Sequence, residues 1–195
     1  MSLRASGVLC ALLNLLSFNA SAVMLDFESL EHDDLLQVNH GNSYTEKGFN
    51  ISGVNLFSNG TQRQDYHGST ALFFGLQGVD GTLTASGGHA FNLVSINLVE
   101  VNSWSPTDKV TFTGYLQGVE VASQDFTLDN VFAMGSGFQT FSFNGFENVT
   151  SVVWQNSNPF HQFDNIVVTP VPAAAWLFAS GLLGLLGMTR RRRSA

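Results

Sequence analysis

Short apolar runs separated by glycine, asparagine and serine make up most of this 195-residue chain. Across 110–116, apolar residues alternate with Thr111, Thr113 and Tyr115, which is the period of two typical of a half-buried strand. A Gln-Gly turn at 117–118 follows, and the apolar positions then resume. The pattern predicts two strands joined by a tight turn.

The same signals recur along the chain, and no apolar run of helical length and period competes with them between the two ends. Strands are expected at 24–28, 48–53, 54–58, 71–74, 82–85, 91–101, 110–116, 119–125, 138–143, 150–155 and 165–169. Many short strands without an internal repeat favour a mainly β fold, an antiparallel β-sandwich.

The first 22 residues have a different pattern, that of a secretory signal peptide. A positively charged start precedes an apolar run at 8–16, and Ala-Ser-Ala at 20–22 is a small-x-small cleavage site. We therefore expect a signal-peptide helix over 1–22 and a mature chain that begins at Val23. Cleavage removes Cys10, the chain's single cysteine, so a packed core and not disulfide bonds must stabilise the exported part.

Residues 170–195 form a tail with three parts. These are the proline motif Pro170, Val171 and Pro172, the uncharged segment 173–189, and the basic cluster Arg190, Arg191, Arg192 and Arg193. Proline fixes φ and lacks an amide donor, which predicts an extended, unpaired stretch at the motif. The apolar segment predicts a single C-terminal transmembrane helix, with the arginines holding the C-terminus in the cytoplasm.

Charge is distributed unevenly between the tail and the domain expected at 23–169. The domain holds all 15 acidic residues but only Lys47, Arg63 and Lys109 of the eight basic ones. Its three positive against fifteen negative charges give −12, whereas the whole chain carries −7. Nucleic acid is thereby excluded as a partner, because phosphate contacts need lysine and arginine. Cations, neutral polysaccharide or simple solubility remain as explanations of the charge.

The order of the tail's parts resembles the PEP-CTERM sorting signal of Gram-negative bacteria. The match covers 170–195, including Val-Pro-Ala-Ala-Ala-Trp-Leu-Phe at 171–178 and Ser-Gly-Leu-Leu-Gly-Leu at 180–185. The chain departs from the family at Val171, where glutamate usually stands between the prolines, and this puts the efficiency of processing in question. The resemblance implies an exosortase partner, a membrane protease that cuts near the motif, and an association with exopolysaccharide and biofilm.

A stripe of Gly181, Gly184 and Gly187 lies along the expected transmembrane helix. Small residues let a second helix approach closely, and exosortase would be such a partner. The alternative is a plain tail anchor. Under the sorting interpretation the chain crosses the inner membrane, stays anchored there transiently, and then reaches the cell surface or extracellular matrix.

Segments at 25–28, 44–49, 91–96, 111–114 and 163–168 resemble the ectodomains that usually precede this tail, which are similar to the jelly-roll sandwiches of carbohydrate-binding modules. In such jelly rolls a structural Ca²⁺ often lies between the first and last strands, which implies Glu28 and Asp164, and less strongly Asp26, as ligands. Asp164 shares strand parity with Ile166 and Val168, and a buried carboxylate needs a cation or several donors. Alternatively, Asp164 caps a turn and Glu28 is solvated.

Aromatic residues in the domain suggest contacts to a sugar ring. Trp104, Tyr66 and Trp154 could each offer a flat face, although Trp154 inside a strand also fits a core position and Trp104 a plain loop. Catalytic motifs are absent from the sequence: the five histidines form no H-x-H or H-E-x-x-H, and there is no G-x-S-x-G. A carboxylate pair such as Glu100 and Glu120 carries little weight among 15 acids.

Three functions therefore remain. We favour a noncatalytic exported protein of the cell surface or extracellular matrix, sorted by its tail. The first alternative is a carbohydrate-binding module of the surface matrix, and the second is a polysaccharide hydrolase acting through Glu28 or Asp164.

Overall fold

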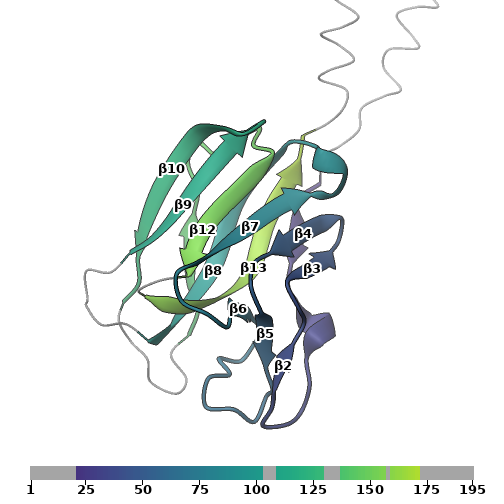
Figure 1. The fold of residues 1–195 in the computed structure, drawn as a ribbon, viewed down its shortest axis with the longest axis vertical. Helices are drawn as coiled ribbons and strands as arrows, with labels where there is room; N and C mark the ends of the chain where they lie inside the picture. The colour runs from purple at the N-terminus through teal and green to yellow at the C-terminus, as the bar shows by residue number, and fades with distance from the viewer. Residues whose placement is uncertain (1–20, 103–108, 130–136, 157–158, 172–195) are drawn as a thin grey trace, which may run out of the picture. The chain divides into compact units, whose positions relative to one another are not determined.

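Two facing antiparallel sheets form the domain in the computed structural model, which describes residues 21–102, 109–129, 137–156 and 159–171 (Figure 1). Residues from Ala22 to Pro170 form one compact unit. The antiparallel β-sandwich that the alternating pattern predicts is therefore confirmed.

Within the described residues, the larger sheet has seven strands. They are β1 (Val23–Leu25), β2 (Gln37–Asn39), β5 (Leu56–Asn59), β6 (Leu72–Phe74), β8 (Phe91–Asn102), β11 (Gln139–Ser142) and β13 (Phe160–Pro170). Their order is β11-β8-β13-β6-β5-β2, and β1 pairs with β13 off this path. Val23 pairs with Val168 and Leu25 with Ile166, so the first and last strands are neighbours, as in the jelly rolls that the sequence resembles.

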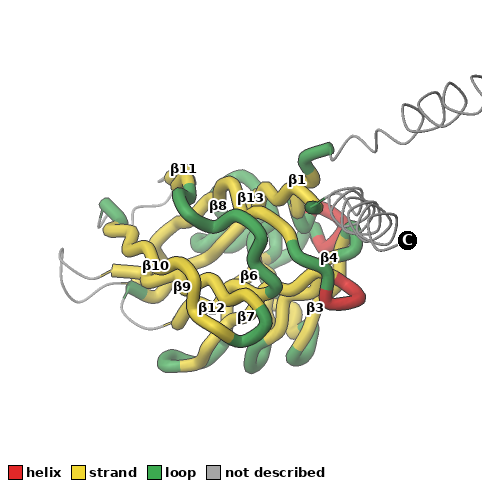
Figure 2. Tube along the Cα trace, turned by 90° about the horizontal axis from the view of Figure 1, so that it is seen from above, coloured by secondary structure: helices red, strands yellow, loops and turns green. Residues whose placement is uncertain are grey.

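The part of the chain that the structure describes contributes six strands to the smaller sheet. They are β3 (Ser43–Glu46), β4 (Phe49–Ser52), β7 (Val79–Ala85), β9 (Lys109–Leu116), β10 (Val119–Thr127) and β12 (Ser151–Asn156), in the order β10-β9-β12-β7-β4-β3. Val119 pairs with Leu116 across the tight turn, which confirms the predicted hairpin. Figure 2 shows β8 and β13 of the larger sheet in a different layer from β9 and β12 of the smaller one.

Helical structure in the described residues is limited to two 3-10 turns, η1 (Glu28–Leu30) and η2 (Ser86–Gly88). Among these residues no helix combines the length and the apolar composition that crossing a bilayer requires. The expected signal helix over 1–22 lies almost wholly, and the expected transmembrane helix over 173–189 entirely, outside them.

Two strands, β2 and β3, were not predicted. All three residues of β2 are exposed, and β3 has the polar sequence Ser-Tyr-Thr-Glu. Neither strand contributes the alternating apolar side chains on which the prediction depended. Both form because a neighbouring strand, β5 or β4, presents free backbone donors and acceptors to them.

Strand ends also differ from the prediction. The strand expected at 24–28 stops at Leu25, because Phe27 adopts the left-handed conformation (φ 52°) and Glu28 begins η1. At the other end, β13 extends to Pro170, which pairs with Phe91. The prediction of an unpaired stretch is thus wrong at Pro170, the first residue of the proline motif.

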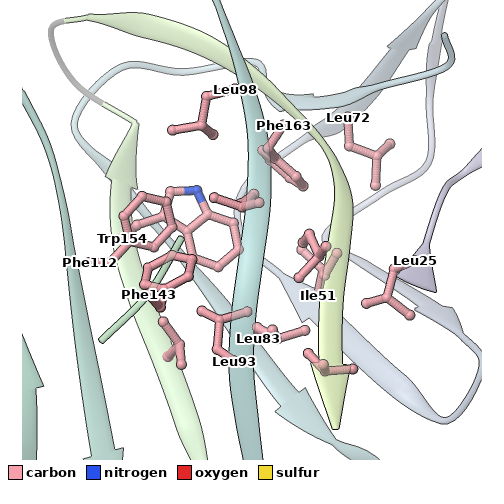
Figure 3. Packing of buried hydrophobic residues seen from close by; sticks show 14 of the residues in the cluster. Leu25, Ile51, Leu72, Leu83, Leu93, Leu98, Phe112, Phe143, Trp154 and Phe163 are labelled. Atoms are coloured by element: carbon pink, nitrogen blue, oxygen red, sulfur yellow. The ribbon is translucent and has the colours of Figure 1, made fainter. Parts of the chain in front are cut away.

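Aromatic side chains form the centre of the core (Figure 3). The Trp154 ring stacks on Phe112 at 5.5 Å and meets the edge of Phe163 at 5.2 Å, joining the two sheets. Trp154 is therefore a core residue and not a surface for sugar. Gly81 makes room for this cluster, since a Cβ there would lie 2.4 Å from the ring of Phe74.

Candidate functional site

A polar lobe forms where segment 28–36 pairs with loop 60–70, and we use this name for the two segments together. The Thr61 amide donates to the His32 carbonyl at 3.0 Å. The Thr61 hydroxyl donates to the Asp33 carboxylate at 2.6 Å. Side-chain and backbone hydrogen bonds, not regular strand pairing, therefore hold the lobe together.

Close approach of the two segments requires glycine at position 60. A Cβ on Gly60 would lie 2.3 Å from the carbonyl oxygen of Asp34. The Asp34 carboxylate in turn accepts the Leu36 amide at 2.8 Å and contacts His32 Nδ1 at 2.8 Å. These hydrogen bonds hold the pKa of Asp34 below its ordinary value, the Leu36 amide having the largest effect. The lobe thus has a defined shape although most of its residues are at least partly exposed.

A surface pocket of about 330 Å³ lies in this lobe, and we call it the loop pocket. Its lining residues are Leu35, Gln62, Arg63, Gln64 and Asp65. The volume lies near the lower end of the range typical of small-ligand sites. One apolar side chain, two amides, a guanidinium and a carboxylate suit a ligand that has C–H faces and hydroxyl groups.

Arg63 is held firmly within the loop pocket. Its Nη1 donates to the Leu35 carbonyl at 3.2 Å, and its Nη2 donates to the Asp65 carboxylate at 3.1 Å. The Asp65 carbonyl accepts from Gln162 Nε2 at 2.8 Å and from Asn59 Nδ2 at 3.3 Å. Because Gln162 and Asn59 belong to strands of the larger sheet, the pocket loop is fixed to the sandwich.

Tyr66, predicted from the sequence as a glycan contact, follows directly after the loop pocket. Its hydroxyl donates to Glu31 Oε2 at 3.3 Å. Burial of the ring, followed by the negative charge of Glu31, raises the pKa of Tyr66. The ring is partly buried and joins the two segments of the lobe.

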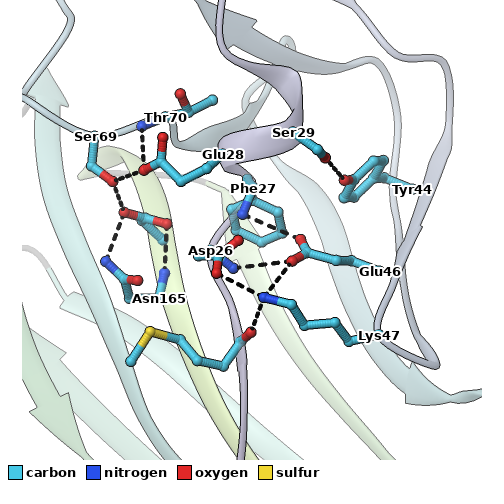
Figure 4. Close-up of polar contacts among 12 residues, drawn as sticks. Asp26, Phe27, Glu28, Ser29, Tyr44, Glu46, Lys47, Ser69, Thr70 and Asn165 are labelled. Atoms are coloured by element: carbon cyan, nitrogen blue, oxygen red, sulfur yellow. Dashed lines mark hydrogen bonds and ion pairs between the residues drawn. The ribbon is translucent and has the colours of Figure 1, made fainter.

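Two carboxylates meet one hydroxyl at the other end of the lobe, in what we call the acidic corner: Glu28, Ser69 and Asp164. Figure 4 shows the contact between Glu28 and Ser69. Ser69 Oγ lies 2.7 Å from Glu28 Oε1 and 2.7 Å from Asp164 Oδ2. A hydroxyl has one proton and can donate to only one carboxylate. If both contacts are hydrogen bonds, the other carboxyl must itself be protonated and donate to Ser69.

Asp164 is the better of the two to hold that proton. Its side chain is fully buried, and burial raises the pKa of Asp164 to about 6, helped by the nearby charges of Glu28 and Asp26. Hydrogen bonds from Ser69 and the Asn165 amide oppose the rise without cancelling it. Asp164, Ile166 and Val168 are all buried, as their shared strand parity predicts.

Asp26, the weaker calcium candidate, does not join the acidic corner. Its carboxylate receives a hydrogen bond from Lys47 Nζ at 2.7 Å, and this bond lowers the pKa of Asp26. Lys47 also lies 3.0 Å from Glu46 Oε1. Lys47 therefore holds Asp26 in its ionised form and partly offsets its charge. Among the described residues, no three histidine, cysteine, aspartate or glutamate side chains gather as a metal site would need.

The other carboxylate pair considered for catalysis, Glu100 and Glu120, is not brought together. Glu100 is buried on β8 of the larger sheet, whereas Glu120 is exposed on β10 of the smaller sheet. His161 is buried too; its Nδ1 lies 2.8 Å from the Pro159 carbonyl, and burial lowers the pKa of His161 to about 4. The geometry provides no nucleophile with an adjacent base at these positions.

Several residues predicted from the sequence lie outside the described part of the chain. These are Trp104, Pro172, Gly181, Gly184, Gly187, Arg190, Arg191, Arg192 and Arg193. Val171 is described and follows β13 outside any strand.

Sequence reasoning named Tyr66 but missed the pocket beside it. Arg63 was counted only as one of three domain cations, and Ser69 was not considered. One sequence signal could have drawn attention to the loop: the lobe has a single arginine and five acidic residues. These acids are Glu28, Glu31, Asp33, Asp34 and Asp65. The corner's contact between Ser69 and Asp164 joins positions 95 residues apart, for which no local pattern exists.

Comparisons with known proteins support the fold. No protein-family model matches the chain, and no curated protein does either. A DUF4465 family protein from Bacteroides caccae has a similar structure, with a TM-score of 0.53 and 13% identity over 77% of this chain and 100% of the other. At this identity the likeness extends to the fold alone.

Two carbohydrate-binding modules are more distant structural neighbours. A family 35 module from Clostridium thermocellum has a TM-score of 0.40 and 15% identity, covering 78% of this chain and 100% of the module. A family 29 module has a TM-score of 0.40 and 10% identity, covering 77% and 91%. Scores this low support no assignment of function, which therefore depends on the chain's own residues.

Proposed function

We propose that this chain is a noncatalytic exported surface protein whose sandwich binds carbohydrate through the loop pocket. The proposal combines two interpretations of the sequence: the noncatalytic exported protein that we favoured and the carbohydrate-binding module that was its first alternative. The observation that carries it is the pocket lining, in which the exposed Leu35 adjoins the polar groups of Gln62, Arg63, Gln64 and Asp65. Sugar rings present apolar C–H faces and hydroxyl groups, which these side chains complement.

Binding to a glycan array tests this proposal. The full-length chain, purified in detergent, should bind a subset of glycans, and Gln64→Ala should weaken that binding by about tenfold, the effect of losing roughly one ligand hydrogen bond. Gln155→Ala is the matched control, since Gln155 is an exposed glutamine on β12 that lines no part of the pocket. Equal effects of the two changes, or no binding by the wild type, would rule the proposal out.

Export and sorting form the second part of the proposal. The signal peptide 1–22 would direct the chain across the inner membrane, the helix 173–189 would hold it there, and exosortase would cut near Pro170, Val171 and Pro172. The tail's resemblance to PEP-CTERM supports this route. Since Pro170 lies within β13, cleavage on its C-terminal side would leave that strand intact. Expression with and without an exosortase, followed by mass spectrometry, tests it: an intact tail in both cases would contradict sorting.

A structural Ca²⁺ at the acidic corner is a second candidate property, favoured by the convergence of Glu28 and Asp164 on Ser69. The fit is partial, because Ca²⁺ takes about six to eight oxygen ligands, and these side chains would need backbone carbonyls and water to complete the set. Binding would use the ionised form of Asp164, which predominates above pH about 6 because the pKa of Asp164 is raised to about 6. Calcium should then raise the melting temperature of the wild type but not of Asp164→Asn. Equal melting of the wild type in calcium and in chelator would reject the site.

A further inference from the structure

The ion pair between Arg63 and Asp65 in the loop pocket bears on which sugars the pocket accepts. Arg63 is the only lysine or arginine in the polar lobe, which holds five acidic residues. Its guanidinium is paired with Asp65 at 3.1 Å and also bonded to the Leu35 carbonyl. The arginine charge is thus offset by a carboxylate that lines the same pocket.

We infer that the loop pocket selects uncharged sugar residues, and that Asp65 is the residue that sets this preference. This inference rests on the proposed carbohydrate function and names its ligand class. A sugar hydroxyl both donates and accepts a hydrogen bond, so one hydroxyl, or two on adjacent carbons, can accept from an Arg63 N–H and donate to the Asp65 carboxylate.

An acidic sugar such as a uronic acid meets a different environment. Its carboxylate only accepts hydrogen bonds, and it would have to lie beside Asp65 with Asp33 and Asp34 on the same lobe. Repulsion between like charges disfavours this arrangement. Arg63 compensates only in part, because its positive charge is already offset by Asp65 and a uronate would compete with Asp65 for it.

The pocket is rigid enough for this selectivity to persist. Gln162 and Asn59 hold the Asp65 backbone, and the Arg63 amide donates to the Gly60 carbonyl at 3.0 Å. The Tyr66 amide donates to the Arg63 carbonyl at 3.2 Å, which closes the loop behind the pocket. These contacts fix the Asp65 backbone, and the Asp65 carboxylate could turn away from an acidic ligand only by giving up its ion pair with Arg63.

Calorimetric titration of the full-length chain with two sets of hexasaccharides tests the inference. One set contains glucose, mannose and galactose oligomers, and the other contains oligomers of galacturonic acid and glucuronic acid. The wild type should bind at least one neutral oligomer at least tenfold more tightly than any uronate. Asp65→Asn frees the Arg63 charge and should shift the ratio of uronate to neutral affinity by tenfold or more. Arg63→Gln in the Asp65→Asn background should abolish that gain.

Asp80→Asn is the matched control. Asp80 is an exposed carboxylate on β7 outside the pocket, so the change removes the same charge and should leave the ratio within twofold. Far-ultraviolet circular dichroism before each titration verifies that the variants are folded.

The outcomes separate this inference from the proposed function. Tight uronate binding by the wild type, or an unchanged ratio in a folded Asp65→Asn, overturns the inference and leaves carbohydrate binding in place. A wild type that binds no sugar of either set, and nothing on the glycan array, overturns both.

Discussion

The aromatic core and the polar lobe are held together by different forces. In the core, the buried Trp154 ring lies 5.5 Å from the Phe112 ring and 5.2 Å from the Phe163 ring, measured between ring centroids. In the lobe, segments about 30 residues apart are joined by hydrogen bonds between largely polar side chains and the backbone. Because a buried ring removes more apolar surface from water than a single partly exposed hydrogen bond stabilises, we expect changes in the core to destabilise the domain more than changes in the lobe.

Removing a central aromatic ring tests how much the core contributes to stability, and it should lower the free energy of unfolding more than any other change proposed below. Trp154→Ala would leave a cavity between the sheets and lower the free energy of unfolding by about 3–5 kcal/mol. The neighbouring Val153 is only half-buried and packs outside this ring cluster, so Val153→Ala should cost about 1 kcal/mol or less. Urea denaturation followed by near-ultraviolet circular dichroism measures both. Equal losses would show that the ring cluster is not the centre of stability.

Asp164 is buried with the core but contacts Ser69 of the lobe, and its titration should make the stability of the domain depend on pH. The pKa of Asp164 is raised in the folded state from 3.8 to about 6. The folded state therefore binds the proton more tightly than the unfolded state does, and the resulting stability is fully present below pH 3.8. It is lost as the pH rises through about 6. The loss amounts to roughly 3 kcal/mol at most.

Comparison with Asp164→Asn isolates this effect from that of other carboxylates. Asparagine resembles the protonated aspartate, so the variant should be close to the wild type at pH 4 and more stable than it at pH 8. Urea midpoints measured across this range in the absence of calcium provide the test. A constant difference between the two proteins would mean that Asp164 does not titrate as stated.

A change at Glu46 should have a smaller effect on stability. This residue contacts the chain at Phe27, the buried residue directly before the polar lobe. Its carboxylate accepts the Phe27 amide at 3.2 Å and the Asp26 amide at 3.4 Å, and it supports the left-handed backbone of Phe27. Glu46→Ala leaves these amides without that partner and should cost about 1–3 kcal/mol. Glu46→Gln retains an acceptor oxygen and should recover part of the loss. Faster hydrogen exchange of the Phe27 amide in the alanine variant would accompany the loss, and unchanged exchange would contradict it.

Lys47 should have the smallest effect. Its ion pair with Asp26 is short, at 2.7 Å, but the lysine side chain is 43% exposed. Exposed pairs contribute at most about 1 kcal/mol, so Lys47→Met should lower the free energy of unfolding by less than that. The pKa of Asp26 should rise toward its ordinary value, because the Lys47 hydrogen bond is the main cause of its depression. Nuclear magnetic resonance titration of the Asp26 carboxyl measures this, and an unchanged pKa would refute the assignment.

Much of the sandwich was predictable because burial leaves a local trace in a strand. The alternation over 110–116 gave both the hairpin and its buried face, and strand parity placed Asp164 among buried positions. Strands β2 and β3 left no such trace, since β2 is exposed throughout and β3 is largely polar. Their pairing depends on backbone groups offered by other strands, which no side-chain pattern reports.

The candidate site was predictable only in fragments. Glu28, Asp164 and Tyr66 were identified from resemblance and residue type, and the structure places all three on or beside the polar lobe. Asp26 was named only as the weaker calcium ligand, from the jelly-roll resemblance, and nothing in the local sequence indicates that Lys47 lies within 2.7 Å of it. The loop pocket was not predicted at all, since its shape depends on Gly60 allowing two distant segments to touch.

The sequence by itself determined the β-rich character of the domain and its charge of −12, which follow from composition and from periodicity within a few residues. Export is predicted from the pattern at the N-terminal end, and sorting stays a prediction from the tail's resemblance to PEP-CTERM. Only the tertiary structure decided that Ser69 lies between Glu28 and Asp164, and that Arg63 and Asp65 face a common pocket. Such contacts depend on how the loops close against the packed sheets, so the local sequence does not specify them.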